Sequence, residues 1–593
     1  MKKLFLSAWL ITLGLTQAFF AQQLPKGFTD LEWQMVKNGE VNPVVLPNGI
    51  TTPPVGSYVR SAAEWEEIQC LTIAWTGYTN ILKAIVAAAK LETRVIILSE
   101  DVQATQDYLL STQGGTALPD LNNVTILPCN FDSIWMRDYA GNTVYKNEVD
   151  SLVMVDWIYN RPTRPNDDAS PECIATELNI PLHTMTVAPN DLVNTGGNWM
   201  VDGLGTAFAS DLILEENIAG NPYGVSAKTE SQIDGIVEDY LGINRYIKMN
   251  TLPYDGIHHI DMHMKLLDEE TLLVGEYPDG VSDGPQINAN IEYVLSNYNS
   301  VWGTPYHVVR IPMPSSATGG WPSTGSSYRT FTNAVFVNKT IILPTYREQV
   351  DTTALRIWEE SMPGYNIVGI DCDNNTSNII SQSGAIHCIT HSVGVEDPML
   401  ITHQSLQDTD NDQDPYNVTA YINHRSGIAS AQLYWRLFGN TTYNVVDMVN
   451  IGNGNWQGFI PAQAVGSMVQ YYVQGESVSG KVQVRPITAP AGYWDFTVVG
   501  VNAVTNIFPV LETKLFPNPA SAITCLRWNA PFTSEYQVDL LDMTGRKVSS
   551  LFNGMASIGE RQIFFNANEF PAGVYVVQIK HQYGVQTIHL CIQ

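Results

Sequence analysis

The hydrophobic pattern of the first two thirds of the chain mixes two periods. Between about residue 25 and about residue 395, short apolar runs flanked by turn residues alternate with segments of helical spacing. Arg94–Leu98 and Ile341–Leu343 are runs of the first kind, and Ile81–Leu91 has apolar residues at helical spacing. Strands that alternate with helices are typical of an α/β domain, which we place at residues 25–398.

The pattern changes near residue 400, after which only strand signals remain. Leu433, Trp435 and Leu437 alternate with more polar neighbours, and Val469–Gln474 repeats this period of two. Trp494–Phe496 has the composition of a last strand. Short strands separated by glycine- and asparagine-rich turns predict an immunoglobulin-like or fibronectin-like β-sandwich over residues 418–500.

An acidic stretch that ends in proline, Asp408–Pro415, precedes this sandwich, and we interpret residues 399–417 as a linker. Its spaced aspartates resemble the start of a calcium loop. The sixth position lacks the glycine and the twelfth lacks the glutamate that such a loop requires. The sequence therefore favours a linker over an ion site.

The C-terminal residues 510–593 carry three turn-rich motifs, Leu515–Ala520, Asp542–Arg546 and Pro571–Tyr575. Their Pro, Asn and Gly residues mark the turns of a second small β-sandwich. The same motifs, in this order, resemble the type IX secretion sorting domain. The resemblance implies that the type IX secretion machinery carries the protein across the outer membrane, to be released or attached at the surface.

The N-terminus predicts export. Lys2 and Lys3 precede the apolar run Leu4–Leu15, and small residues follow up to Ala21. This is the pattern of a secretory signal peptide, which we place at residues 1–21. The run is shorter than the roughly 20 residues that a membrane span requires, so we expect no span.

Charge and cysteine usage exclude several classes of protein. The formal net charge of −28 disfavours nucleic acid and anionic membrane surfaces as partners. The seven cysteines are an odd number, so at least one thiol stays unpaired within a monomer. Their scattered spacing excludes a CxxC redox pair and a zinc cluster.

Four short clusters in the α/β domain carry candidate chemistry: Trp135–Tyr139, His258–His263, Phe331–Asn333 and Ser383–His391. Taken singly, each has an ordinary structural explanation. A buried Arg–Asp pair is commonly structural, and a cysteine between isoleucines is commonly a small core residue. The histidines lack a third ligand at helical spacing, which disfavours a zinc site.

Together the clusters supply what the hydrolysis of a guanidinium requires. Asp138 and Asp261 can hold the two sides of this planar cation. Cys388 offers the soft nucleophile, and His259 offers an acid and base of near-neutral pKa. If residues 259–261 form a strand, His259 and Asp261 point to the same face. We expect a cationic His259 to lower the pKa of the Cys388 thiol.

These residues stand in a longer series of motifs: Glu64–Glu67, Trp135-x-Arg137-Asp138, Thr195–Asn198, His259-x-Asp261, Asn333 and Gly384-x-x-His387-Cys388. In this order they resemble the family of agmatine deiminases and bacterial, Porphyromonas-type peptidylarginine deiminases. The resemblance implies a pentein fold, a pseudo-fivefold α/β propeller of ββαβ units around a central pocket. It also implies catalysis through a thiouronium intermediate, without a metal or other cofactor.

The resemblance assigns roles by position. It makes Cys388 the nucleophile and His259 the general acid and base, with Asp138 and Asp261 holding the guanidinium and Asn333 orienting the site. It also makes Trp135 a wall of the substrate pocket. Gly197 and Asn198 belong to a Gly-Gly-Asn segment whose backbone approaches the pocket closely.

The substrate is the open question. Agmatine has no carboxylate, and its enzymes often place an acid where this chain has Thr195. Arg161 and Arg164 instead lie in a loop that resembles the carboxylate-binding loop of the bacterial peptidylarginine deiminase. In an extended loop their odd separation would point them to opposite sides, which favours Arg161 over Arg164 as the ligand of the carboxylate. An exposed loop without a binding role is the plainer interpretation.

We therefore expect an exported deiminase that acts on arginine-containing peptides or proteins and converts arginine to citrulline and ammonia. An agmatine deiminase is the alternative. A catalytically inert surface adhesion protein is a more distant one, disfavoured because Cys388, His259, Asp138 and Asp261 are all present.

Overall fold

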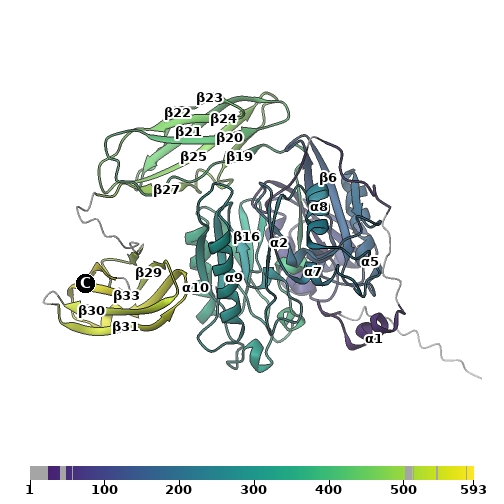
Figure 1. The fold of residues 1–593 in the computed structure, drawn as a ribbon, viewed down its shortest axis with the longest axis horizontal. Helices are drawn as coiled ribbons and strands as arrows, with labels where there is room; N and C mark the ends of the chain where they lie inside the picture. The colour runs from purple at the N-terminus through teal and green to yellow at the C-terminus, as the bar shows by residue number, and fades with distance from the viewer. Residues whose placement is uncertain are drawn as a thin grey trace, which may run out of the picture.

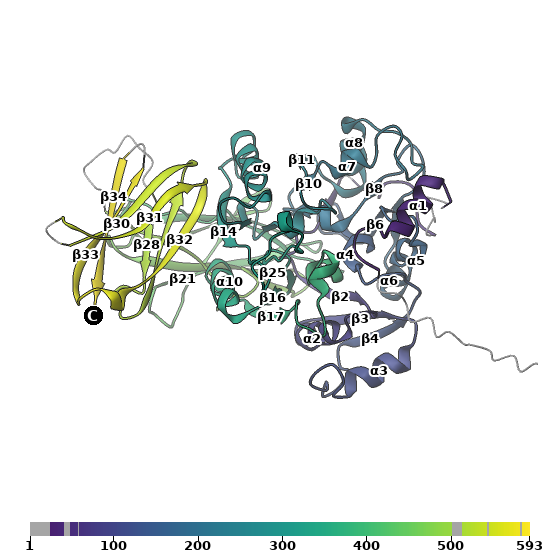
Figure 2. The same ribbon diagram turned by 90° about the horizontal axis from the view of Figure 1, so that it is seen from below.

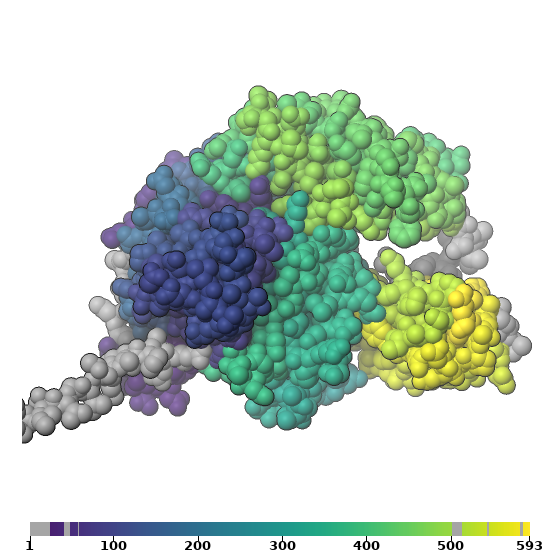
Figure 3. Space-filling view, turned by 180° about the vertical axis from the view of Figure 1, so that it is seen from behind, coloured from purple at the N-terminus to yellow at the C-terminus, as the bar shows by residue number. Residues whose placement is uncertain are grey.

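The computed structural model describes residues 24–40, 48–56, 58–500, 511, 513–542, 545–581 and 584–593, so the proposed signal peptide at residues 1–21 lies outside the described residues. Figure 1 shows an α/β body in purple to teal, a green β-sandwich above it, and a yellow β-sandwich beside α9 and α10. Figure 3 shows that both sandwiches pack on the teal part of the α/β body. No helix in the described ranges is long and apolar enough to cross a membrane.

The sheets of the α/β body share one connection pattern. In the unit β12 (Met264–Leu266), β13 (Thr271–Glu276), α9 (Asp283–Asn297) and β14 (His307–Pro312), an antiparallel hairpin is followed by a helix and a parallel strand. Antiparallel strands need only a tight turn between them, whereas the parallel strand needs the longer crossover that the helix provides. Within the described residues this ββαβ arrangement occurs in five sheets.

The other four sheets repeat it with small additions. Their strands and connecting helices are β5 (Asn142–Lys146), β6 (Ser151–Tyr159), α5 (Pro165–Ala169), α6 (Pro171–Leu178) and β7 (Leu182–Met185); β9 (Met200–Val201), β10 (Thr206–Ser210), α7 (Leu212–Glu215), α8 (Glu230–Leu241) and β11 (Arg245–Met249); β15 (Val335–Val337), β16 (Thr340–Thr345), α10 (Glu348–Ser361) and β17 (Asn366–Asp371); and β18 (His391–Gly394), β2 (Ile68–Ala74), α2 (Thr79–Ala89) and β3 (Arg94–Ser99). Figure 2 shows these units from below. At the sheet edges, β1 (Val59–Ser61) pairs with β5 and β4 (Val124–Pro128) with β3, while β8 (Val193–Asn194) pairs with β6; α3 (Val102–Leu110) connects β3 to β4.

The predicted elements of this body are confirmed. β3 covers the apolar run at 94–98, β16 covers 341–343, and α2 begins and ends two residues before the predicted range 81–91. Four consecutive residues of β3, numbers 95–98, are completely buried because helices and loops cover both faces of the sheet. β18 pairs with β2, which joins the end of the α/β body to its beginning.

The middle domain is a two-sheet sandwich. One sheet has the order β19 (Leu400–Thr402), β20 (Tyr416–Asn423), β24 (Asn455–Ile460), β23 (Val449–Gly452). The other has the order β22 (Asn444–Asp447), β21 (Ile428–Leu437), β25 (Met468–Ser477), β26 (Val482–Arg485), with β27 (Trp494–Thr497) also on β25, as the predicted last strand. β19 lies within residues 399–417, which we interpreted as a linker. This part of the segment belongs to the sandwich instead, since β19 pairs with β20 and its residue Ile401 packs into the sandwich core.

The C-terminal domain is also a two-sheet sandwich. Its sheets have the orders β28 (Thr513–Phe516), β29 (Ile523–Ala530), β32 (Gly559–Asn566) and β31 (Lys547–Ala556), β30 (Ser534–Asp542), β33 (Gly573–His581), β34 (Gly584–Ile592). It docks on the α/β body through polar contacts. An Arg310 Nη2 atom donates to the carbonyl of Ile558 at 3.0 Å, and Asn288 donates to Ser557 at 2.9 Å.

All seven cysteines lie in the described ranges, and only Cys129 and Cys173 form a disulfide. The bond joins the end of β4 to α6 across a sequence separation of 44 residues. The enclosed segment contains Asp138, Arg161 and Arg164. Five thiols stay free, which agrees with the expectation of at least one unpaired cysteine.

Because it restricts the unfolded chain, this disulfide should stabilise the α/β body by about 2–4 kcal/mol. The double substitution Cys129→Ser and Cys173→Ser should lower the urea concentration at the midpoint of unfolding, as measured by tryptophan fluorescence. The unmodified protein should show the same lowered midpoint after its disulfide is reduced. Unchanged unfolding midpoints would contradict the assignment.

Candidate active site

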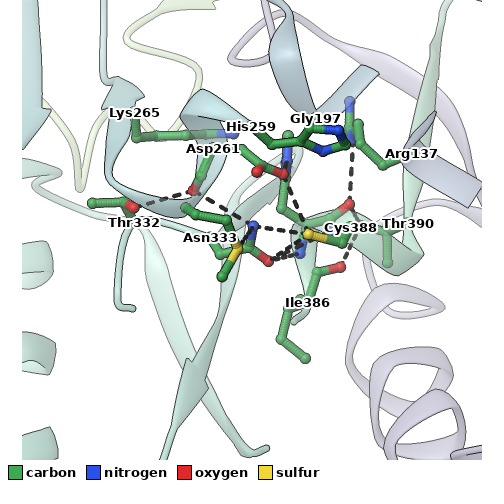
Figure 4. A network of polar contacts seen from close by, with 12 residues as sticks. Arg137, Gly197, His259, Asp261, Lys265, Thr332, Asn333, Ile386, Cys388 and Thr390 are labelled. Carbon is green, nitrogen blue, oxygen red and sulfur yellow. Dashed lines mark hydrogen bonds and ion pairs between the residues drawn. The ribbon is translucent and has the colours of Figure 1, made fainter. Parts of the chain in front are cut away.

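Cys388 lies in the short helix η5 (His387–Ile389) that precedes β18, and it is fully buried. Asn333, in the loop before β15, contacts both the Cys388 sulfur and the backbone of η5. The Asn333 Nδ2 amide lies 3.1 Å from the Cys388 Sγ, and its Oδ1 accepts from the backbone N–H of His387 at 3.0 Å. Figure 4 shows Asn333, Asp261 and His259 gathered around Cys388.

Two fully buried carboxylates face the same centre. Asp138 comes from α4 (Met136–Tyr139) and Asp261 from η2 (Ile260–Met262). The backbone N–H of Gly197 donates to Asp138 Oδ1 at 3.1 Å, and Cys388 Sγ donates to Asp261 Oδ2 at 3.4 Å. Asp138 Oδ2 and Asp261 Oδ1 have no hydrogen-bond partner among the described residues. Buried charges of this kind require a cation.

Lys26 supplies that cation, from a part of the chain that the sequence did not connect with the site. Its Nζ lies 3.9 Å from Asp138 Oδ1, 3.8 Å from Asp261 Oδ1 and 2.9 Å from Cys388 Sγ, and the side chain is completely buried. Burial alone would lower the pKa of Lys26, but the two carboxylates and Cys388 outweigh burial and raise it.

The carboxylates respond differently to this cation. Burial raises the pKa of Asp138, although Lys26 opposes the shift. Burial also acts to raise the pKa of Asp261, but Lys26 and the hydrogen bond from His387 overcome it and hold the pKa well below its usual value. Asp261 is therefore the more firmly ionised of the two.

His259 lies beside Asp138, with 3.6 Å between its Nδ1 and Asp138 Oδ1. Neither ring nitrogen has a hydrogen-bond partner within the part of the chain that the structure describes. A Cβ at Gly197 would overlap the ring, so only glycine allows this approach. Burial, followed by the nearby Lys26, lowers the pKa of His259 far below its usual value, and the imidazole is neutral.

Two expectations about this histidine are wrong. His259 precedes the helical turn η2 and does not share a strand with Asp261; the turn still brings both residues to the site. Nor does a cationic His259 lower the pKa of the thiol. Burial, with the charge of Asp261 next in importance, raises the pKa of Cys388 to about 12.

His387 and Glu64 form a supporting network to which the sequence gave no role. The His387 ring links two carboxylates, with Nδ1 2.8 Å from Asp261 Oδ2 and Nε2 2.7 Å from Glu64 Oε1. Glu64 also lies 2.5 Å from the ammonium of Lys265 and 3.4 Å from Arg137. The network fixes the orientation of Asp261. Its only signal in the sequence was the position of His387 and Glu64 inside the motifs.

Trp135 and Asn198, which the resemblance placed at the pocket, contact different parts of the chain. Trp135 is buried against Gly384 and donates from Nε1 to the carbonyl of Leu24 at 3.0 Å. The hydrogen bonds of the Asn198 side chain go to the backbone of Ser210, at 2.7 and 3.3 Å, and they fix the Gly-Gly-Asn turn.

Arg161 and Arg164 lie on the same side of their loop. The backbone N–H of Arg164 bonds to the carbonyl of Arg161 at 2.8 Å, so the loop is a turn and not extended. The expectation that odd separation points them apart is therefore wrong. Arg161 Nε donates to the carbonyl of Lys26 at 2.9 Å, and Arg164 binds the Glu32 carboxylate, with Nε at 2.8 Å.

The described residues contain no group of three or more His, Cys, Asp or Glu side chains arranged to hold a metal ion. The site combines a thiol, a neutral imidazole and two carboxylates, each of which has an oxygen 3.8 to 3.9 Å from the buried ammonium of Lys26. Such a set can bind a planar cation and attack its carbon.

Comparison with known proteins gives relatives of the α/β body. A Vibrio parahaemolyticus protein named "putative agmatine deiminase" is 26% identical over 299 residues, covering 46% of this chain and 78% of the relative. A Shewanella frigidimarina protein of the same name is 25% identical over 378 residues, covering 58% and 96%.

Solved structures are similar at lower identity. The agmatine deiminase of Enterococcus faecalis has 18% identity and a TM-score of 0.47, covering 58% of this chain and 99% of that one. The agmatine deiminase of C. jejuni has 19% identity and a TM-score of 0.46, covering 56% and 96%.

Two family models match the chain. Residues 514–593 match the secretion system C-terminal sorting domain, which confirms the interpretation of the last domain as a type IX sorting module. Residues 60–393 match the Porphyromonas-type peptidyl-arginine deiminase, and this match covers more than half of the chain and includes Asp138, His259, Asp261, Asn333 and Cys388. The chain therefore belongs to the Porphyromonas-type peptidyl-arginine deiminase family, and it is a hydrolase of amidine C–N bonds with a C-terminal secretion domain.

Proposed function

We propose that this protein is an exported peptidylarginine deiminase, which hydrolyses the guanidinium of arginine residues in peptides or proteins to citrulline and ammonia. One observation carries the proposal. A cationic side chain of a polypeptide segment, Lys26, lies between Asp138 and Asp261 with its end against Cys388 Sγ.

The lengths of the two basic side chains make Lys26 a guide to the position of an arginine. The Nζ of lysine and the Cζ of arginine are separated from Cα by the same number of bonds. An arginine in place of Lys26 would therefore bring its guanidinium carbon near the position of Nζ, 2.9 Å from Cys388 Sγ. Reacting atoms in a near-attack arrangement lie at about 3–3.5 Å.

The carboxylates lie at distances suited to the terminal nitrogens of such a guanidinium. Each C–N bond extends about 1.3 Å beyond Cζ. From 3.9 and 3.8 Å, a fully aligned extension would leave about 2.6 and 2.5 Å to Asp138 and Asp261, and a bent approach slightly more, so charge-assisted hydrogen bonds of about 2.7–2.9 Å fit. The pair would hold the cation while its carbon stays open to the thiol.

The neutral state of His259 suits the first proton transfer. The imidazole accepts the Cys388 proton as sulfur bonds to the guanidinium carbon, then passes it to the departing nitrogen, which leaves as ammonia. A water molecule, deprotonated by His259, next attacks the thiouronium carbon. The C–S bond breaks and the ureido product forms. One proton of the water returns to the thiol, and the other is released to solvent, where ammonia takes it up as ammonium. Asn333 orients the sulfur throughout.

Contacts to the main chain favour a peptide over agmatine. Trp135 and Arg161 both donate to backbone carbonyls, those of Leu24 and Lys26. Agmatine has no carbonyl to accept either bond. Thr195, where an acid would suit the second amine of agmatine, is uncharged and buried. Arg161 can bind the carbonyl of an internal arginine or the carboxylate of a terminal one, whereas Arg164 binds the neighbouring Glu32.

Export and architecture complete the proposal. The N-terminal signal peptide and the sorting domain would deliver the enzyme through the type IX machinery to the cell surface or the medium. The ββαβ units would close into a pentein propeller, with the catalytic residues at its centre and the immunoglobulin-like sandwich outside it.

Replacement of Cys388 by alanine should abolish ureido-product formation, because no other group in the pocket can form the covalent intermediate. Serine at this position should be almost as inactive, since a hydroxyl is far less acidic than a thiol. Colorimetric citrulline detection checks this, with Cys70→Ala, which changes another buried thiol outside the site, as the matched control. Near-normal turnover by Cys388→Ala would end the nucleophile assignment.

Replacement of Arg161 by alanine should lower kcat/KM for arginine peptides by about 10–100-fold, the cost of a charge-assisted hydrogen bond. Turnover of agmatine, weak from the start, should hardly change. The substrates to compare are a peptide ending in arginine, its C-terminal amide, a peptide with internal arginine, and agmatine. Arg546→Ala, an exposed arginine of the sorting domain, is the control. If agmatine were turned over most efficiently, the peptide assignment would be wrong.

A further inference from the structure

The segment that carries Lys26 crosses the pocket as a bound peptide would. On the N-terminal side of Lys26, the carbonyl of Leu24 accepts from Trp135 Nε1 at 3.0 Å. The backbone of Lys26 itself donates to the carbonyl of Gln382 at 3.1 Å and accepts from Arg161 Nε at 2.9 Å. On the C-terminal side, the carbonyl of Gly27 accepts from Arg164 at 2.9 Å. The chain therefore continues on both sides of the buried side chain.

The residue after Lys26 imposes little restriction on sequence. A Cβ at Gly27 would lie 3.7 Å from Ile257, an ordinary van der Waals contact. A substrate with a larger residue at this position could therefore follow the same path. The position does not require glycine.

The next residue packs on an apolar cluster. Phe28 packs against the buried cluster Ile158, Val193, Tyr223 and Val225. The guanidinium of Arg161 lies over its ring, 4.6 Å from the centroid. The site thus offers an apolar, aromatic-binding position two residues after the side chain that enters the pocket.

A short helix anchors this segment. α1 (Asp30–Asn38) begins with a capping box between Thr29 and Glu32. Glu32 also forms a buried ion pair with Arg164, at 2.8 Å, and accepts from the Thr163 hydroxyl at 2.7 Å. Figures 1 and 2 show α1 near α5, and the ion pair of Glu32 connects α1 to Arg164, the residue before α5.

The Lys26 ammonium and a substrate guanidinium cannot occupy the pocket together. Lys26 is fully buried, and its Nζ already contacts Cys388 and both carboxylates. Unlike arginine, lysine has no carbon bearing a displaceable nitrogen at this position, so the thiol has nothing to attack. The segment binds as a substrate would but cannot react.

We infer that residues 24–28 are an intramolecular pseudosubstrate. They keep the enzyme inactive while Lys26 occupies the pocket. Their sequence also indicates the preferred substrate, which is an internal arginine with an aromatic or large apolar residue two positions after it. The inference rests on the proposed peptidylarginine deiminase function. Because the segment is part of the same chain, it competes with substrate at a high effective concentration. Cleavage of the chain after α1 would release the segment and so lower that concentration.

The first test compares Lys26→Ala with the unmodified chain on a blocked peptide, acetyl-Leu-Pro-Arg-Gly-Phe-amide. The variant should raise kcat/KM at least ~10-fold, because the competing cation is removed. Lys37→Ala, which changes a lysine on the exposed side of α1, should behave like the unmodified chain. Alanine in place of the phenylalanine of the peptide should lower kcat/KM about tenfold, by the loss of apolar burial.

The second test uses Lys26→Arg, which turns the segment into a substrate. The new side chain at position 26 should be converted to citrulline within its own chain, at a rate independent of enzyme concentration, as mass spectrometry of the N-terminal peptide can show. The same substitution combined with Cys388→Ala should remain unconverted. This readout does not depend on how well Lys26→Ala folds.

The outcomes separate the two proposals. If Lys26→Ala and the unmodified chain turn over the peptide equally, or position 26 stays unmodified while added peptides are citrullinated, the pseudosubstrate inference is overturned and the deiminase function stands. If no form converts any arginine peptide or position 26, the peptidylarginine function fails and the inference fails with it.

Discussion

Two buried carboxylates that face one centre determine the organisation of this site. Asp138 and Asp261 are fully buried, and each has an oxygen without a hydrogen bond among the described residues. Such a pair is costly unless a cation lies between them. In the structure Lys26 meets this need, and in the proposed reaction a substrate guanidinium does. The reaction removes the charge, so the neutral ureido product would lose the interaction that held the substrate.

The fold brings these groups together from distant parts of the chain. Cys388 reaches the centre because β18, three residues later, pairs with β2 near the beginning of the α/β body. Asp138 and Asp261 come from short helical turns, α4 and η2, which lie outside the sheets. The His387 ring then links Asp261 to Glu64, so the carboxylate orientation depends on contacts between widely separated segments.

The sequence predicted the elements and the chemical groups better than their electrostatic state. The apolar runs at 94–98 and 341–343 are strands, and Cys388, Asp138, Asp261 and Asn333 do converge. The neutral state of His259 could not be predicted, because it depends on burial and on Lys26. Lys26 itself lies in a segment without periodicity, and only the tertiary structure reveals its contact with Cys388.

Local geometry explains the remaining errors. The spacing of Arg161 and Arg164 suggested divergence, but the turn between them places both on one side. β19 was taken for linker because three residues are too few to show a periodic pattern, yet Ile401 belongs to the sandwich core. In both cases the deciding interaction, a hydrogen bond closing a turn or a pairing with β20, leaves little trace in the sequence.

The central claim is that the pocket selects a positive charge. Calorimetry on a variant that combines Cys388→Ala with Lys26→Ala tests it most directly, because this protein can bind but not react. Two peptides that differ only in arginine or citrulline should be compared. The account predicts that the arginine peptide binds at least ~100-fold more tightly, since the citrulline peptide cannot neutralise Asp138 and Asp261. Equal affinities would contradict it.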